Sequence, residues 1–460
     1  MTVDLVVTGG KLVLPNGIED ACLAIESGRI SAIVKEPNLP SADETITLNG
    51  ELVFPGAIDP HVHFKSPWLE LEEIDTGTAS AAGGGITMVV DYLFSGDDMS
   101  LVDAFHKRKK EAESKICCDY SLHAIISSGS QDELNQLAQL IKLGIVSFKV
   151  FTTYSDFVTT STGYFLEVFK EVARAGGMVS AHCEDDGILQ YYTEKAKQSG
   201  KNDPVSYVES RPPIAESISL QTMLELTRQT NVRFRIVHIN TKRGVEIIRH
   251  AKNSGLLVTA ETCPHYLILT KKDMEKNGHL LKMSPPLRGP SDNKALWDGL
   301  ASGTVDMVGT DHSPMHLLKD LQRMKDDIWS IDPGIPGMET MVPLLFDRGV
   351  NGGLISVERF AEVTSTQTAK SLGLYPRKGA LIVGADADLT IIDPRKESKI
   401  QADKLHSKAD YTPFEGWHVK GVPVKTIVRG VLVMDNGYPG DIVGKPGFGS
   451  YIVPTTAEKS

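Results

Sequence analysis

The sequence predicts an α/β fold in which a (β/α)8 TIM-like barrel carries a composite β-sandwich formed by both chain ends. Two observations lead to this prediction. The centre of the chain alternates apolar stretches with amphipathic helical stretches, and both ends alternate short apolar runs with glycine and asparagine turns. Because parallel strands need helical crossovers, eight such central units favour a closed barrel. A doubly wound open sheet is the structural alternative, and the positions of the polar residues described below argue against it.

Eight segments in the centre of the chain have the apolar, β-branched composition of barrel strands. Helical stretches, among them 101–114 and 219–230, lie between them. The strand segments are 53–59, 86–91, 120–126, 146–151, 178–184, 234–239, 257–262 and 305–311.

The two chain ends have the spacing of short antiparallel hairpins, as in "DLVVTGGKLVLPNG" and "VPVKTIVRGVLVMDNG". Neither end has enough strands for a stable sheet pair alone. We therefore expect one composite β-sandwich from residues 1–55 and 375–445, a metal-binding barrel over 56–374, and a C-terminal tail over 446–460. The apolar and aromatic tail "GKPGFGSYIVPTT" could cover a neighbouring subunit, which gives weak support to a homo-oligomer.

The composition excludes several classes of protein. The 460 residues are 41% hydrophobic and 23% charged, with a net charge of −11 and no basic block, so nucleic acid is not an expected partner. No apolar run has the length of a membrane-spanning helix, and the start "MTVDLVVTGG" has neither the basic nor the apolar region of a secretion signal. We expect a cytoplasmic protein that acts on a small molecule.

Chemically capable side chains occur at the ends of nearly all the predicted strands. Because the carboxyl ends of parallel strands meet at one mouth of a barrel, we expect these side chains to converge there. They are His61, His63, Asp91, His123, Lys149, His182, His238, Glu261 and Asp311.

The segment "DPHVHF" is the most specific local motif. His61 and His63 are two residues apart, so in a strand both imidazoles point to the same side and can bind one metal ion. His182, His238 and Asp311 add further ligands. Four histidines and one aspartate are too many for one tetrahedral zinc with an open position and too few for two closed sites. The count fits two metal ions that share a bridging group.

Lys149 lies in the apolar strand "VSFKVF", where an unpaired ammonium would be costly. No aspartate or glutamate occupies this strand end, but a lysine that has added CO2 becomes a carbamate, which can bridge two metal ions. Burial favours the neutral amine that this reaction needs. The alternative is a Lys149 that pairs with an acidic residue across the barrel.

The whole chain resembles the amidohydrolase superfamily and, within it, the cyclic amidohydrolase group of hydantoinases, dihydropyrimidinases, allantoinases and dihydroorotases. The resemblance runs nearly end to end through motifs such as "PGAIDPHVHF", "FKVFTTY", "AHCED", "ETCPHYL" and "GTDHSP". It implies one metal ion held by His61, His63 and Asp311. It also implies a carboxylated Lys149 bridging to a second ion, which His182 and His238 complete.

The resemblance is strongest to hydantoinases and dihydropyrimidinases. It implies that Tyr154 contacts the substrate carbonyl and the oxyanion, and that the backbone of Ser284 binds the ring amide. Gly337 stands where the subgroup has an asparagine that contacts the substrate through its main chain. Lys65 follows "HVHF" where dihydroorotases have an arginine for the substrate carboxylate, although a solvated loop lysine is the favoured interpretation.

These observations predict a hydrolase that opens a five- or six-membered cyclic ureide or imide with a hydroxide bridging two divalent metal ions, zinc or alternatively manganese. Tyr154 and Asp311 are the expected catalytic residues, the latter as the group that moves the proton. Allantoinase and then dihydroorotase are the alternative activities. A non-catalytic dihydropyrimidinase-like scaffold is the alternative from another class, and the six intact ligand positions argue against it. The resemblance also implies a homotetramer or a dimer.

Overall fold

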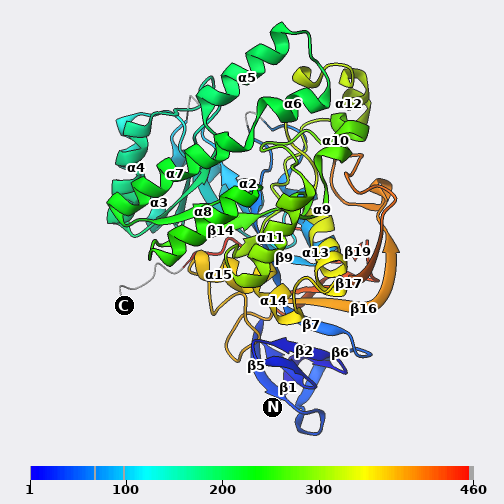
Figure 1. The fold of residues 1–460 in the computed structure, drawn as a ribbon. Coiled ribbons are helices and arrows are strands. Elements are labelled where there is room, and N and C mark those ends of the chain that lie inside the picture. Colours follow the sequence, from blue (N-terminus) through cyan, green and yellow to red (C-terminus); the bar gives the residue numbers. More distant parts are fainter. Residues whose placement is uncertain (1, 67–68, 97–98, 455–460) are drawn as a thin grey trace.

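The computed structural model describes residues 2–66, 69–96 and 99–454. Its centre is an eight-stranded parallel sheet in which the strands follow one another in chain order (Figure 1). This confirms the predicted barrel. The strands are β8 (Ala57–Val62), β9 (Ile86–Leu93), β10 (Asp119–Ile125), β11 (Ser147–Phe151), β12 (Met178–His182), β13 (Arg233–Ile236), β14 (Val258–Thr262) and β15 (Met307–Val308).

The barrel closes between its first strand and the segment that follows its last. Val62 and His312 form a parallel bridge, and the His63 N–H donates to the His312 carbonyl at 2.9 Å. Helices cover the outside of the strands, as the period of the apolar residues predicts (Figure 1). Those that follow barrel strands are α1 (Ile74–Gly83), α2 (Leu101–Ala112), α3 (Gln131–Lys142), α4 (Thr162–Ala175), α7 (Pro213–Thr230), α8 (Lys242–Asn253) and α11 (Pro290–Ser302).

Further helices lie in the loops between these units. Two of them, α5 and α6, lie at the end of the molecule opposite the N-terminal strands (Figure 1). They are α5 (Asp186–Gln198), α6 (Pro204–Ser210), α9 (Pro264–Ile268), α10 (Lys271–Asn277), α12 (Leu318–Met324), α13 (Met341–Leu345), α14 (Val357–Ala361) and α15 (Gln367–Ser371).

The chain ends form two further sheets, one of which mixes strands from both ends. The first, in the order β5-β4-β1-β6, consists of β1 (Thr2–Thr8), β4 (Cys22–Glu26), β5 (Arg29–Val34) and β6 (Ser41–Thr47). The second, in the order β19-β18-β17-β16-β7-β2-β3, consists of β2 (Lys11–Leu14), β3 (Gly17–Glu19), β7 (Leu52–Pro55), β16 (Leu389–Lys399), β17 (His418–Val428), β18 (Val431–Asp435) and β19 (Asp441–Ile442). The mixed sheet confirms the composite architecture, and the exact domain boundaries stay predictions.

The first predicted strand, 53–59, is wrong as a single element, because the chain changes sheets at Gly56. Leu52–Pro55 pairs with β16, and the barrel strand begins at Ala57. A Cβ at Gly56 would lie 2.2 Å from the Thr87 hydroxyl oxygen, so a larger residue would not fit at this crossing.

The described part of the C-terminal tail packs on the barrel of its own chain. Tyr120 donates its N–H to the Ser450 carbonyl at 3.0 Å, and Ile452 donates to the Tyr120 carbonyl at 2.8 Å. The Tyr451 ring contacts Phe105 edge-on at 5.3 Å. The final residues, 455–460, lie outside the described residues.

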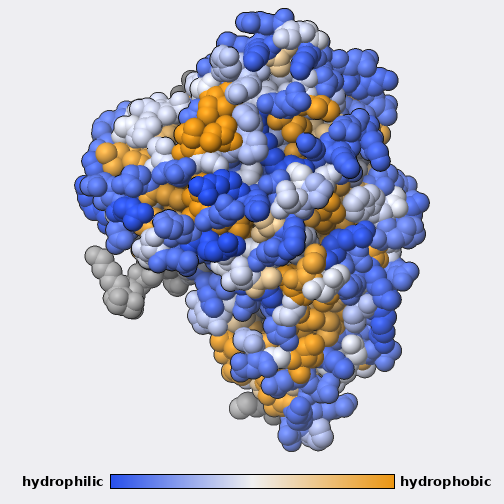
Figure 2. All heavy atoms as spheres, viewed as in Figure 1, coloured by the Kyte–Doolittle hydropathy of each residue, from blue (hydrophilic) through white to orange (hydrophobic). Residues whose placement is uncertain are grey.

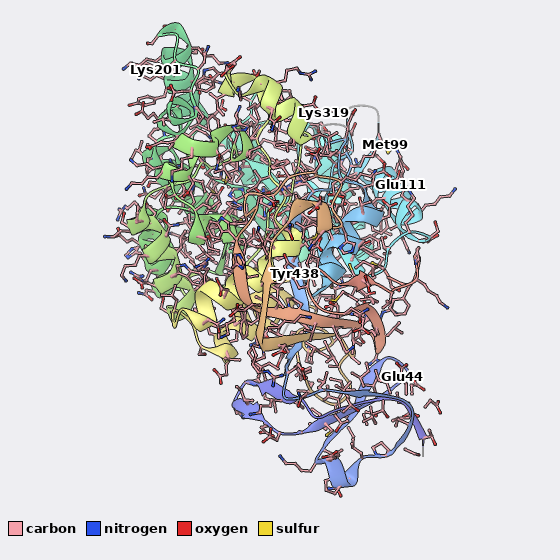
Figure 3. All side chains as sticks on the ribbon, turned by 90° about the vertical axis from the view of Figure 1, so that its right-hand side faces the viewer. Glu44, Met99, Glu111, Lys201, Lys319 and Tyr438 are labelled. Carbon is pink, nitrogen blue, oxygen red and sulfur yellow. The ribbon has the colours of Figure 1, made fainter. Side chains whose placement is uncertain are left out.

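The surface agrees with the composition. Hydrophilic residues cover most of the face seen in Figure 2, and apolar side chains reach it in separate patches. Glu44 of β6 and Lys201, which follows α5, mark opposite ends of the molecule in Figure 3. No helix in the described parts of the chain is long and apolar enough to span a membrane.

Candidate metal centre and substrate cavity

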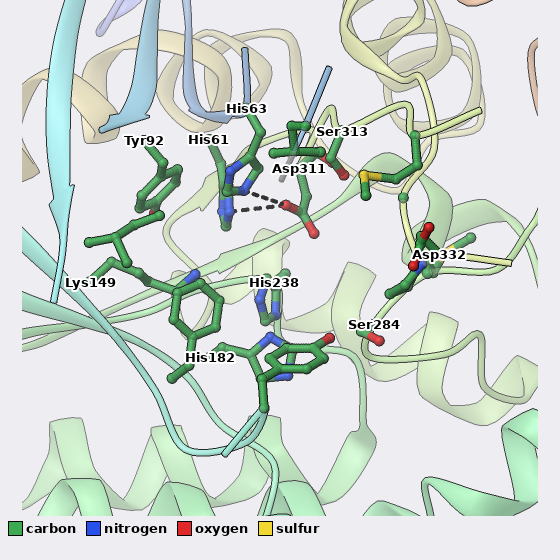
Figure 4. Close-up of a pocket in the computed structure, with 18 of the residues that line it drawn as sticks. His61, His63, Tyr92, Lys149, His182, His238, Ser284, Asp311, Ser313 and Asp332 are labelled. Atoms are coloured by element: carbon green, nitrogen blue, oxygen red, sulfur yellow. Dashed lines mark hydrogen bonds and ion pairs between the residues drawn. The ribbon is translucent and has the colours of Figure 1, made fainter. Parts of the chain in front are cut away.

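A cavity of about 390 Å³ lies at the carboxyl ends of the barrel strands, where active sites of such barrels are found (Figure 4). Nine residues are predicted as metal ligands or substrate contacts, and all of them except Gly337 line this cavity. Those that line the cavity are His61, His63, Lys149, Tyr154, His182, His238, Ser284 and Asp311.

His61, His63 and Asp311 form a compact group at one side of this cavity. Their potential ligand atoms all lie within 4.8 Å of one another. The Nε2 atoms of His61 and His63 lie 3.1 Å and 3.2 Å from the same Asp311 oxygen (Figure 4). Burial raises the pKa of Asp311, but the neighbouring histidines outweigh this effect and hold that pKa well below its usual range. The carboxylate is therefore ionised, as a metal ligand must be.

Two buried carboxylates, Glu261 and Asp59, form hydrogen bonds that hold this group in place. Glu261 lies 2.6 Å from the Nδ1 of His61, which leaves Nε2 as the nitrogen that faces the cavity. Asp59 accepts the Thr310 N–H at 3.0 Å and thereby holds the residue before Asp311. Glu261 is expected at a strand end from the sequence, but without this role, and Asp59 is not among the residues predicted for the site.

Lys149 is 1% exposed and lies at the base of the cavity. Its ammonium group faces the rings of Tyr92 and Phe151, with Nζ 4.9 Å and 4.8 Å from the two centroids. Lys149 forms no ion pair with any residue that the structure describes. Burial lowers the pKa of its amine to about 8. The alternative in which Lys149 pairs with an acidic residue across the barrel is therefore wrong within the described chain.

His182 and His238 lie opposite the first group, with ring centroids 4.6 Å apart. His182 Nε2 lies 2.8 Å from Glu184, and the same carboxylate pairs with Arg211. Burial raises the pKa of Glu184, but Arg211 outweighs it and lowers the pKa to about 2. Neither Glu184 nor Arg211 is among the residues predicted from the sequence, although Glu184 lies in the motif "AHCED".

Three cavity residues have backbone conformations that side chains rarely adopt. The φ angles of Tyr154, His238 and Asp311 are 68°, 38° and 51°. Such left-handed conformations cost of order 1–3 kcal/mol each and are found at functional sites whose surroundings hold them in place. Here they aim three side chains into the same cavity.

Several predicted residues lie elsewhere. Gly337 is buried beside the cavity but does not line it, and its carbonyl accepts hydrogen bonds from Thr340. Lys65 pairs with Glu73 at 3.7 Å, and its side chain is 57% exposed, as expected for a solvated loop lysine. Asp91 and His123 are buried below the cavity and pair with arginines rather than facing its mouth.

The remaining cavity wall is mainly apolar. Apart from the metal-competent group and the tyrosines Tyr92 and Tyr154, its ionisable members are His265 and Asp332. Asp332 lies at the edge, with 63% of its side chain exposed and His316 at 3.3 Å. The apolar lining residues are Leu69, Phe94, Ile125, Phe151, Phe157, Val158, Met283, Met315, Pro333 and Ile335.

Comparison with known proteins identifies the class to which this fold and site belong. The model of the amidohydrolase family matches residues 52–433, and the chain belongs to that family. It is 35% identical to D-hydantoinase from Geobacillus stearothermophilus, over 97% of this chain and 95% of the relative. It is 32% identical to L-hydantoinase from Paenarthrobacter aurescens, over 99% of both chains. The crystal structure of dihydropyrimidinase from Brevibacillus agri superposes with a TM-score of 0.92 at 31% identity, covering 99% of both chains.

The residues at the base of the cavity fit a divalent metal centre. His61 Nε2 is buried and forms no hydrogen bond with any described residue, although the Asp311 oxygen lies close by. His61 Nε2 and an Asp311 oxygen lie 3.1 Å apart at the cavity, and an imidazole nitrogen and a carboxylate oxygen are donor types that a divalent cation binds. The imidazole and carboxylate donors suit zinc or manganese.

Proposed function

We propose that this chain hydrolyses the amide bond of a five- or six-membered cyclic ureide or imide of the hydantoin or dihydropyrimidine type. One observation carries the proposal. Six metal-competent side chains and Tyr154 meet in one cavity of a chain whose similarity to hydantoinases covers nearly its full length. The six ligand positions argue against a non-catalytic scaffold.

The proposed metal ligands are His61, His63 and Asp311 for one ion and His182 and His238 for a second. Divalent ions held there, zinc or alternatively manganese, would lower the pKa of a water molecule and polarise the substrate carbonyl. The contacts of His61 with Glu261 and of His182 with Glu184 would orient the two imidazoles.

Carboxylation of Lys149 would supply the negative charge shared by the two ions. In this reaction the neutral Nζ attacks CO2, a nitrogen–carbon bond forms, and one proton leaves the nitrogen. Two features support it: Lys149 has no ion-pair partner in the described chain, and burial lowers its pKa to about 8. The apolar rings of Tyr92 and Phe151 separate the group from bulk water.

The remaining proposed roles concern binding and proton movement. Tyr154 would donate a hydrogen bond to the oxyanion, because burial raises the pKa of its phenol and keeps it protonated. The ionised Asp311 would take a proton from the attacking water and deliver it to the ring nitrogen that leaves. The backbone of Ser284 would hold the ring amide. Gly337 remains a predicted substrate contact, although it does not line the cavity.

The lining of the cavity favours a substrate with an uncharged, apolar side group. Ten apolar residues form most of the wall outside the metal-competent group, and its outer edge carries the Asp332 carboxylate. No cation other than Lys149 and the histidines lines the described cavity, and Lys65 points to Glu73. An anionic side group, as in dihydroorotate, would meet repulsion there, and the polar ureido group of allantoin would lose hydrogen bonds with water.

A substrate panel tests this proposal. Metal-loaded protein is assayed with hydantoin, 5-phenylhydantoin, dihydrouracil, allantoin and dihydroorotate. We expect kcat/KM to be highest for 5-phenylhydantoin or dihydrouracil and lowest for dihydroorotate. A preference for dihydroorotate or allantoin would overturn the assignment. Stoichiometric metal without hydrolysis of any of the five rings would contradict the proposed function as a whole.

The predicted homo-oligomer, a tetramer or alternatively a dimer, and the predicted cytoplasmic location rest on the family resemblance and on the composition. Light scattering on the purified protein measures the oligomeric state. A monomer at micromolar concentration would contradict the first of these predictions.

A further inference from the structure

The imidazole of His312, next to Asp311 in the chain, makes hydrogen bonds on both of its nitrogens. It is 1% exposed. Its Nε2 lies 3.2 Å from a Glu72 oxygen, and its Nδ1 accepts the N–H groups of Gly337 at 3.2 Å and Met338 at 3.4 Å. A neutral imidazole has one donor and one acceptor. These contacts are satisfied together only when the proton is on Nε2.

Glu72 is what holds this tautomer. Its carboxylate is 2% exposed and also accepts the hydroxyls of Thr76 and Ser407 and the N–H of Lys408, at 3.2 Å for the last. An ionised carboxylate can only accept, so it requires a donor at His312 Nε2. Thr76 lies in α1, and Ser407 and Lys408 lie in the C-terminal part of the chain. Their hydrogen bonds hold the Glu72 carboxylate in place relative to these two segments.

The backbone at His312 and Ser313 connects two further regions, at His63 and at Ile335. The His312 carbonyl accepts the His63 N–H at 2.9 Å. The next residue, Ser313, donates its N–H to the Ile335 carbonyl at 3.1 Å. Residues 332–335 form part of the cavity wall. His312 thus lies between His63, which directly follows β8, and the segment 332–335, which lines the cavity.

We infer that His312 is a positioning residue: through its Nδ1 it sets the 332–338 segment, whose residues 332–335 line the substrate cavity, relative to the proposed metal ligands. Glu72 maintains the tautomer that makes this possible. The substrate named in this inference rests on the proposed function, whereas the contacts of His312 do not depend on it. The inference also gives Gly337 a role: its N–H anchors the wall to His312.

Two substitutions separate the two sides of the imidazole. His312→Asn places an amide oxygen near the position of Nδ1 and keeps the acceptor for Gly337 and Met338. His312→Gln places an amide nitrogen near Nε2, keeps the donor to Glu72 and loses that acceptor. We expect KM for 5-phenylhydantoin to rise about 5- to 30-fold in His312→Gln and to stay within about threefold of the wild-type value in His312→Asn.

Hydrogen exchange supplies a readout that needs no substrate. The Gly337 and Met338 amides should exchange about tenfold faster or more in His312→Gln than in His312→Asn. Metal content should stay the same in both variants. Because exchange is measured without turnover, a failure of this inference can be distinguished from a failure of the proposed function.

His406→Gln is the matched control. His406 pairs with Glu339 at 2.8 Å, a second histidine–glutamate contact that lies outside the cavity lining. Its KM and the exchange of the Gly337 amide should not change. Equal KM values in His312→Asn and His312→Gln would overturn the inference. So would faster exchange in His312→Gln without a rise in KM, since His312 would then have only a structural role.

Discussion

Two buried lysines, at opposite ends of the barrel, have opposite electrostatic surroundings. Lys149, inside β11 at the mouth, and Lys378, at the opposite end, are each 1% exposed. Lys378 Nζ lies 2.6 Å from Asp119, 2.6 Å from Asp388 and 3.1 Å from Asp386. Lys149 has no such partner among the described residues and faces aromatic rings instead.

The partners decide the charge of each lysine. Burial lowers the pKa of both amines, but the three aspartates outweigh it at Lys378 and raise its pKa above the ordinary range. At Lys149 burial dominates, and the pKa falls to about 8. A paired cation stabilises the contact between barrel and sheets, whereas an unpaired amine is available for reaction. This agrees with the usual division between the stable and the catalytic face of such barrels.

The largest expected effect is that of removing Lys149. Lys149→Ala should lose binding of two metal ions and lower kcat/KM by more than the roughly 100-fold typical of residues that only support a metal ligand. Metal analysis and the hydantoin assay measure both. Because the buried amine has no partner to lose, the Tm of the metal-free variant should equal or exceed that of the metal-free wild type. Full activity with two bound ions would break the comparison.

Lys378→Met tests the opposite end. It leaves three aspartates without their shared cation, so we expect a loss of about 3–5 kcal/mol in the free energy of unfolding. Urea denaturation measures the loss, and kcat of the folded variant should change less than about twofold because the cluster lies far from the cavity. Lys294→Met removes an exposed pair with Asp298 and should cost less than about 1 kcal/mol. Equal losses in the two variants would contradict the role given to burial.

Tyr154→Phe should have a smaller effect, confined to the chemical step. Loss of one donor to the oxyanion is expected to lower kcat by about 10²–10³-fold, which corresponds to about 3 kcal/mol. Steady-state kinetics on 5-phenylhydantoin measure it. Tyr191→Phe, on the exposed side of α5, serves as the control. An unchanged kcat in Tyr154→Phe would remove the tyrosine from the mechanism.

The smallest expected effect is a pH dependence of reconstitution. Carboxylation needs the neutral amine, whose fraction falls about tenfold for each pH unit below a pKa of about 8. At fixed dissolved CO2, the rate at which metal-free protein regains activity with zinc should rise from pH 6 to pH 8 and then level off. Lys378 has a raised pKa, so its contribution to stability is complete below the unfolded value and stays constant over this range. A flat reconstitution rate would contradict the lowered pKa of Lys149.

The sequence predicted most of the barrel because strand and helix periods are local properties. The residues of segment 146–151 by themselves predict a strand. The position of the site at the mouth of the barrel follows because the carboxyl ends of parallel strands lie together. The single strand expected at 53–59 failed for a non-local reason: Gly56 crosses between two sheets at a point set by Thr87 and by Asp388. The direction in which the tail packs likewise depends on Tyr120, far away in the chain.

The supporting residues of the site could not be predicted for the same reason. Glu261 contacts His61 across 200 residues, and Arg211 contacts Glu184 across 27 residues. A motif shows which residue types are present, but the choice of partner depends on which loops meet. Gly337 shows this limit. Its position in the sequence predicted a contact with the substrate, whereas in the structure its N–H donates to His312 and its carbonyl accepts the Thr340 hydroxyl.

The sequence by itself determined that a lysine lies inside an apolar strand among histidines at strand ends. Only the tertiary structure decided which of the buried lysines is neutralised by aspartates and which is left without a partner. The physical reason is that burial depends on the local apolar pattern, whereas the charge of a buried group depends on the groups that the fold brings to within a few ångströms of it.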